Sequence, residues 1–80
     1  MLQLRIVSPE KIEFDGVIES VIVPGTMGQF EILKDHAPII STLQKGMVEY
    51  TTKEGKSSLE IQGGFVEVQK NVVSLCVEMA

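Results

Sequence analysis

The sequence has no tryptophan and only one tyrosine, one cysteine and one histidine among its 80 residues. A single cysteine excludes an internal disulfide framework and fits a reducing compartment. The longest uncharged run, residues 20–30, is interrupted by a proline and two glycines and is too short to cross a bilayer as a helix. Met1 leads directly into a strand pattern, without the basic and apolar regions of a signal peptide. These absences predict a soluble intracellular domain.

Positive charge is scarce as well. The chain has 7 lysine and arginine residues against 11 acidic ones, which gives a formal net charge of −4. The basic residues are scattered, with neither a run nor interleaved aromatics, and this argues against nucleic-acid binding. The hydrophobic fraction of 44% is ordinary for a folded domain. We therefore expect one domain over residues 1–80, close to the lower size limit for a core without disulfides or metals.

Apolar and polar residues alternate with a period of two along much of the chain, beginning with residues 2–7, and this alternation predicts β-strands. Asp15-Gly16 stands between two such runs and predicts a tight hairpin turn. Residues 53–56 predict a second hairpin, and Lys70-Asn71 predicts another tight turn. Gly63-Gly64 is expected to break or bulge the chain between two further runs.

No segment shows a sustained helical period. Residues 39–43 are ambiguous, because Asp35 could cap a short helix there although Pro38 and Gly46 leave little room for one. The sequence predicts an all-β fold, an antiparallel β-sandwich of about ten short strands in two sheets. Residues 24–38 hold the only histidine and two of the three prolines, and we expect them to form a shaped loop, where function tends to lie.

His36 and Cys76 are the residues that could carry catalysis. His36 follows Asp35 directly, and adjacent side chains on an extended strand point apart, so Asp35 is not placed to orient an imidazole base. Cys76 lies in mid-strand, which favours a half-buried structural thiol over a nucleophile. One histidine, one cysteine and scattered carboxylates give no metal-ligand spacing, and no glycine-rich loop precedes a helix with a lysine. We expect no catalytic residue, no metal and no cofactor.

Met27, Gln29 and Phe30 leave two interpretations open. They could close the end of the sandwich, or they could form an exposed patch that marks a protein contact. The residues alone support a small all-β domain that binds or scaffolds. The alternative function is a stand-alone ligand-binding or adaptor sandwich that holds a small molecule or glycan at the 24–38 end, although the chain has few aromatics to line such a pocket.

Five segments, taken in order and spacing, resemble the N-terminal domain of the epsilon subunit of F-type ATP synthases. They are Ile6-Val7-Ser8-Pro9-Glu10, Phe14-Asp15-Gly16, Val23-Pro24-Gly25, His36-Ala37-Pro38 and Gly63-Gly64-Phe65-Val66-Glu67-Val68. The resemblance covers residues 2–79. It implies a ten-stranded sandwich in the rotating central stalk, which contacts the gamma subunit, rests on the membrane ring of c subunits and transmits rotation between proton flow and ATP synthesis. It implies no active site and no small-molecule substrate of its own.

The resemblance also implies site residues. Those carried over to the c-ring interface are Met27, Gln29 and Phe30, and those carried over to the gamma-subunit interface are Ser8, His36 and Ser41. Glu31 stands where the family usually has glycine and Lys34 where it usually has proline, so we expect a loop that depends less on glycine and carries an extra pair of opposite charges.

The chain stops where typical members continue into a two-helix hairpin that can bind ATP and inhibit hydrolysis. We expect a single sandwich domain over residues 1–80 with that hairpin absent. The implied location is the cytoplasmic face of the bacterial inner membrane, where the domain is peripheral and associates with the membrane only through the complex.

Overall fold

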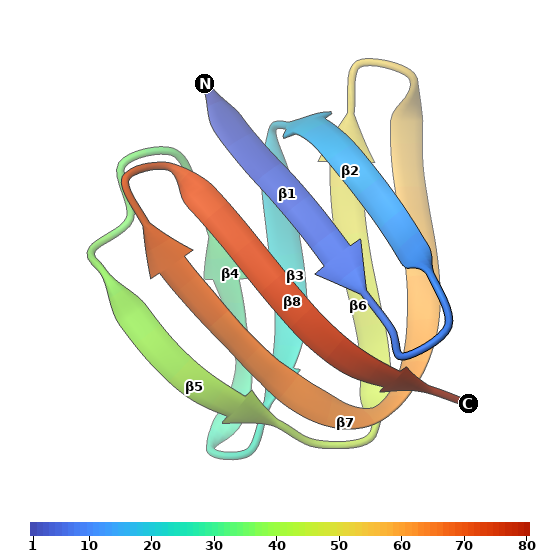
Figure 1. Cartoon of the computed structure of the whole chain (residues 1–80). Coiled ribbons are helices and arrows are strands. Elements are labelled where there is room, and N and C mark those ends of the chain that lie inside the picture. Colours follow the sequence, from blue (N-terminus) through green and yellow to red (C-terminus); the bar gives the residue numbers. More distant parts are fainter.

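The computed structural model describes all 80 residues, and the chain forms eight β-strands in two packed layers (Figure 1). The strands are β1 (Leu2–Val7), β2 (Ile12–Ile18), β3 (Ser20–Gly25), β4 (Gly28–Ile32), β5 (Ile39–Leu43), β6 (Gly46–Thr52), β7 (Gly55–Gln69) and β8 (Val72–Met79). In the view of Figure 1, β5, β8 and β1 lie nearer, and β3, β4 and β6 lie behind them. The structure contains no helix long and apolar enough to span a membrane.

Hydrogen bonds join the strands in the order β2-β1-β8-β7-β5-β3-β4, and β6 pairs with β3 and β7. Every pair is antiparallel except β1 with β8, which run parallel. The first half of β7 pairs with β6, and its second half pairs with β5 and β8. The predicted sandwich is therefore confirmed, but β7 belongs to both layers and links them into one hydrogen-bonded system.

The bend that allows β7 to change layers lies at the predicted glycine pair. Ile61 pairs with Met79 and Gly63 pairs with Glu78, so Gln62 is an extra residue that makes a β-bulge. Gly64 follows with a φ of 148°, a conformation that side-chain-bearing residues rarely adopt. A Cβ atom at Gly64 would also overlap the carbonyl oxygen of Cys76 on β8. The glycine is therefore required both by the backbone conformation and by the close approach of the two strands.

The core lies between the layers and is built from the inward-facing residues of all eight strands. Leu2, Leu4 and Ile6 on β1 are buried, and so are alternate residues of β8, as the alternation predicts. The cluster of 15 buried residues consists of Leu2, Leu4, Ile6, Ile18, Val21, Val23, Ile32, Leu43, Val48, Ile61, Val66, Val68, Val73, Leu75 and Val77. Burying one such side chain fully contributes about 1.5–3 kcal/mol, so this cluster is the main source of stability.

The hairpin predicted at Asp15-Gly16 is wrong. Both residues lie inside β2, where Asp15 is opposite Arg5 and Gly16 is opposite Leu4 on β1. The turn comes earlier, at Ser8, whose backbone N–H donates to the carbonyl oxygen of Lys11 at 2.9 Å. The run before Asp15 therefore pairs with β1 instead of with the run that follows. Since β2 and β7 each continue through a predicted interruption, the chain has eight strands where about ten were expected.

The other predicted turns are confirmed. Thr52 pairs with Gly55 across a two-residue turn between β6 and β7. Lys70 and Asn71 have φ values of 51° and 62°, and two consecutive positive φ values suit a tight antiparallel hairpin. The ambiguous residues 39–43 form a strand, β5.

Candidate interaction surfaces

Residues 24–38, predicted as one shaped loop, are a hairpin followed by a shorter loop. The chain turns at Thr26-Met27 between β3 and β4, and the side chain of Met27 at the tip is 99% exposed. Gln29 is exposed on β4, whereas Phe30 is half-buried and packs against the core. A Cβ atom at Gly25 would lie 2.9 Å from the Phe30 ring, so the ring rests on the glycine backbone. Of the three residues expected at the c-ring, two are exposed and Phe30 closes the end of the sandwich.

The tip of this hairpin is fixed to the end of β5 and to the connection that follows it. Thr26 and Thr42 share a hydroxyl hydrogen bond of 2.8 Å, and the backbone N–H of Thr26 donates to the carbonyl oxygen of Thr42 at 3.1 Å. The side-chain amide of Gln44 donates to the carbonyl oxygen of Gly25 at 3.2 Å. Met27 and Gln29 therefore project from an end of the molecule that these hydrogen bonds hold in place.

Ser8, expected at the gamma interface, is buried and makes its hydrogen bonds within the turn that follows β1. Its side chain is 6% exposed, and Oγ donates to Glu13 Oε2 at 2.9 Å while accepting from the Lys11 backbone N–H at 3.3 Å. Glu13 has no partner on β1 and bulges from β2, which directs its carboxylate toward the serine. Ser8 therefore shapes the end of β1.

Replacing Ser8 with alanine is expected to lower the free energy of unfolding by about 1–2 kcal/mol, because the Lys11 N–H and the Glu13 carboxylate lose a partner in a partly buried place. Denaturant unfolding measures the change. Ser41→Ala is the matched control, since Ser41 Oγ makes only a long, 3.3 Å bond to the neighbouring Thr42 carbonyl oxygen, and it should leave stability within about 0.5 kcal/mol of wild type. Equal losses in the two variants would contradict this role for Ser8.

His36 lies in the loop between β4 and β5, half-buried. Its backbone N–H donates to the carbonyl oxygen of Leu33 at 3.2 Å, and its Nδ1 lies 2.8 Å from the carbonyl oxygen of Ala37. Asp35 bonds to Asn71 and makes no bond to the imidazole, so the two do not form a base and its orienter. Cys76 is exposed on β8, so the expected half-buried thiol is wrong.

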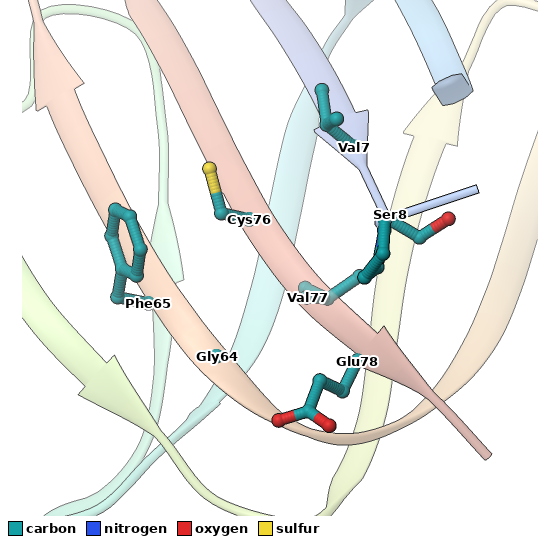
Figure 2. A pocket seen from close by; sticks show the side chains of 8 residues that line it. Val7, Ser8, Gly64, Phe65, Cys76, Val77 and Glu78 are labelled. Carbon is teal, nitrogen blue, oxygen red and sulfur yellow. The ribbon is translucent and has the colours of Figure 1, made fainter. Parts of the chain in front are cut away.

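A row of apolar side chains crosses the outer face of the layer that contains β2, β1, β8 and β7. The row consists of Ile12, Val7, Cys76 and Phe65, each opposite the next across neighbouring strands. Figure 2 shows Phe65, Cys76 and Val7 along this face. Ile12 is 50% exposed and Phe65 is 47% exposed, although both are large apolar residues. We call these four residues the outer row.

A shallow depression of about 390 Å³ lies along the outer row, between the ends of β1 and β8 and the middle of β7. Ser8 lines one side of it, Glu78 another, and Gly64 contributes no side chain (Figure 2). Glu67 and Ser74 pair in the next row of the same face. An apolar centre with a polar border is the usual anatomy of a protein–protein interface. One aromatic ring lines the depression, and this makes it a weak candidate for enclosing a small molecule.

The two sets of residues expected at interfaces lie apart. Met27 and Gln29 are at the end formed by the β3–β4 turn, while the His36 loop is at the opposite end of β4. Ser41 is half-buried on the core-facing side of β5, opposite Val66. Ser8 follows β1 and the His36 loop precedes β5, so these two flank the layer that carries the outer row. No three residues of the metal-binding types His, Cys, Asp and Glu are grouped so that they could hold an ion.

The fold and the outer row define a small β-sandwich domain with an exposed apolar patch on one face, the kind of surface that is common at protein contacts. The family profile described as "ATP synthase, Delta/Epsilon chain, beta-sandwich domain" matches residues 1–80. The ATP synthase epsilon chain of Chlorobium limicola is 42% identical over 77 residues, covering 95% of this chain and 88% of that protein. The chain therefore belongs to the ATP synthase delta/epsilon family, and the curated relatives named here are epsilon chains.

Other relatives are longer. The epsilon chain of Leptospira borgpetersenii serovar Hardjo-bovis is 40% identical over 77 residues, which cover 96% of this chain but 61% of that protein. Among solved structures, a chain of the Euglena gracilis mitochondrial ATP synthase matches with a TM-score of 0.88 at 20% identity, covering 95% of this chain and 49% of that one. A chain of the Tetrahymena thermophila mitochondrial ATP synthase central stalk and c-ring matches with a TM-score of 0.81 at 18% identity, covering 96% and 63%. At these identities the structural matches establish the fold.

Proposed function

We propose that this chain is a non-catalytic central-stalk subunit of an ATP synthase, which couples rotation of the gamma subunit and the membrane c-ring to ATP synthesis driven by proton flow. The observation that carries the proposal is the outer row, an exposed apolar surface on a rigid sandwich of the epsilon-chain family. A mechanical coupler needs stiff contact surfaces toward two neighbours, and the molecule offers two, at different places.

The surface proposed for gamma is the outer face of the layer formed by β2, β1, β8, β7 and β5. Phe65 and Ile12 supply exposed apolar area, which binding of gamma would remove from water. Glu67 and Glu78 supply a polar border. Ser8 lies in the turn between β1 and β2, and His36 lies in the loop that leads into β5 on the other side of the layer. Ser41 lies behind this surface, on the core-facing side of β5. Burial of an aromatic anchor at the centre of such a patch contributes most of the affinity in typical interfaces.

The surface proposed for the c-ring is the end formed by the β3–β4 turn. Met27 and Gln29 project there, and Phe30 packs beneath them against Gly25. The bonds between Thr26 and Thr42 hold the turn to the end of β5, so a force applied to the tip passes into β3 and β5. The domain thus transmits torque from one end to the lateral face without a chemical step of its own.

The proposed location is the cytoplasmic face of the bacterial inner membrane, with the domain bound peripherally through the complex. All the elements of the 80 residues are strands, and the function proposed is that of this β-sandwich. The proposal assigns no metal, no cofactor and no small-molecule substrate to these residues.

Mixing the purified chain with an ATP synthase gamma subunit at micromolar concentration tests the proposal. We expect co-elution on a size-exclusion column as a complex of one copy of each. Two independent peaks at that concentration would overturn the proposal. A thermal-shift screen run in parallel tests the stand-alone ligand-binding alternative, which requires a large shift by a small molecule in the absence of gamma.

A further inference from the structure

The loop that carries His36 is tied to the turn between β7 and β8 by one residue pair. The backbone N–H of Asp35 donates to Asn71 Oδ1 at 2.6 Å, and Asn71 Nδ2 donates to Asp35 Oδ1 at 3.0 Å. The two residues are 36 positions apart in the sequence. The backbone carbonyl oxygen of Asn71 also accepts from the N–H of Gln3 on β1 at 2.9 Å. Asn71 therefore joins the loop, the turn and the first strand.

Both members of the pair hold an uncommon backbone conformation. Asp35 has a φ of 65° and Asn71 a φ of 62°, in the left-handed region that asparagine and aspartate tolerate better than most residues. The remainder of the loop has little other support: Leu33, Lys34 and Ala37 are exposed, and the His36 N–H bond to Leu33 is the single further backbone contact of the loop outside the strands. The Asp35–Asn71 pair thus supplies the hydrogen bonds that tie the loop to the rest of the sandwich.

We infer that Asn71 is a positioning residue, which holds the Asp35–His36 loop in the conformation that binds the gamma subunit. This inference rests on the proposed function. A loop that is ordered before binding loses less conformational entropy on association, so its partner binds more tightly. Asn71 lies on the β7–β8 turn and acts on His36 through Asp35, without itself needing to contact the partner.

A charge exchange across the pair tests the inference. Asn71→Asp places two carboxylates against each other, removes the Nδ2 donor and keeps a residue that tolerates positive φ. Asp35→Asn retains both hydrogen bonds, because its amide oxygen still accepts from Asn71 Nδ2. The double variant Asp35→Asn/Asn71→Asp restores a complementary pair with the roles reversed. Two quantities are measured for each variant: hydrogen exchange at the His36 amide relative to that at Leu75 in the core, and the dissociation constant of the gamma complex.

We expect Asn71→Asp to speed exchange at His36 about tenfold with little change at Leu75, and to weaken gamma binding by about the same factor. For Asp35→Asn and for the double variant, the exchange rate at His36 and the dissociation constant should both stay within about twofold of wild type. This is the pattern of a double-mutant cycle on a contacting pair. A residue with a merely structural role would change exchange at Leu75 together with that at His36.

The outcomes separate this inference from the proposed function. A wild-type chain that binds no gamma would overturn the proposed function and the positioning role together. A wild type that binds gamma, with an Asn71→Asp variant that binds equally well, would overturn the positioning role alone. Weak binding that the double variant does not restore would show that charge at position 71 acts on the partner directly, and this would also overturn it.

Discussion

Replacing Gly64 with alanine is expected to destabilise the domain by more than about 3 kcal/mol, a large part of what a domain of this size has available. Two effects combine at this position. A residue with a Cβ atom at a φ of 148° is strained by about 1–3 kcal/mol. The new Cβ would also overlap the carbonyl oxygen of Cys76, so β8 would have to move away from β7 at the bend. Thermal unfolding should show a midpoint lowered by at least about 12 °C.

Two other glycines separate these effects. Gly55 has a φ of 128° with nothing within 4 Å of its virtual Cβ atom, so Gly55→Ala tests backbone strain alone. Gly63 lies outside the left-handed region, and its Cβ would meet the Leu43 carbonyl oxygen at an ordinary 3.5 Å. We expect Gly63→Ala to be close to neutral and Gly55→Ala to cost about 1 kcal/mol. If Gly64→Ala lowered the free energy of unfolding no more than Gly55→Ala does, the close approach of β7 and β8 would not be what requires the glycine.

The core could be predicted from the sequence because burial follows a local rule. Along β1 and β8 every second residue faces the core, and the period of two identifies Leu4 or Leu75 without knowledge of the partner strand. The turn at Lys70-Asn71 was predictable for a similar reason, since asparagine tolerates the left-handed conformation that such a turn needs.

Strand pairing could not be predicted in the same way. Asp15-Gly16 has the composition of a hairpin turn, but Ser8 closes a turn first and the following run pairs with β1. The run then continues through Gly16, whose virtual Cβ atom lies 3.2 Å from the Phe14 ring, so the ring covers the space that a side chain would fill. The choice between two possible partners depends on contacts along the whole strand, and the local residues do not encode it.

The outer row shows the same limit for the candidate site. Its members come from β2, β1, β8 and β7 and meet only because of the register across those strands. Cys76 was judged by its place in the middle of a strand, yet the alternation puts it on the outward side, where it is exposed. The signal that could have found part of the row is that Phe65 and Cys76 are apolar at positions where the alternation predicts solvent. Ile12 falls on the same side as Phe14 by that alternation, and it faces outward because of the bulge at Glu13.

Changing Phe65 to aspartate is expected to weaken gamma binding by at least about 30-fold, which corresponds to the loss of one interface hot spot of about 2 kcal/mol. The aromatic ring is the largest member of the outer row and lies beside the depression between β7 and β8. An aspartate there would lose the apolar contact, and it would place an unpaired carboxylate in a surface from which bound gamma excludes water. Titration of the variant with gamma, followed by calorimetry or by a fluorescent label on gamma, measures the dissociation constant.

The control variant must also replace an exposed apolar side chain with aspartate, at a residue about as exposed as Phe65 but outside the outer row. Met47 on β6 meets this condition, because it is 43% exposed where Phe65 is 47% exposed, and it lies in the other layer. Met47→Asp should lower stability by an amount similar to Phe65→Asp while leaving gamma affinity within about twofold of wild type, since a side chain outside the contact is close to neutral. Equal losses of affinity in both variants would mean that aspartate acts by loosening the sandwich, and the gamma surface would then have to be sought elsewhere on the molecule. A loss of gamma affinity in the Phe65 variant alone would instead locate the gamma contact on the outer face of β7 and β8. These are the two strands whose close approach Gly64 makes possible.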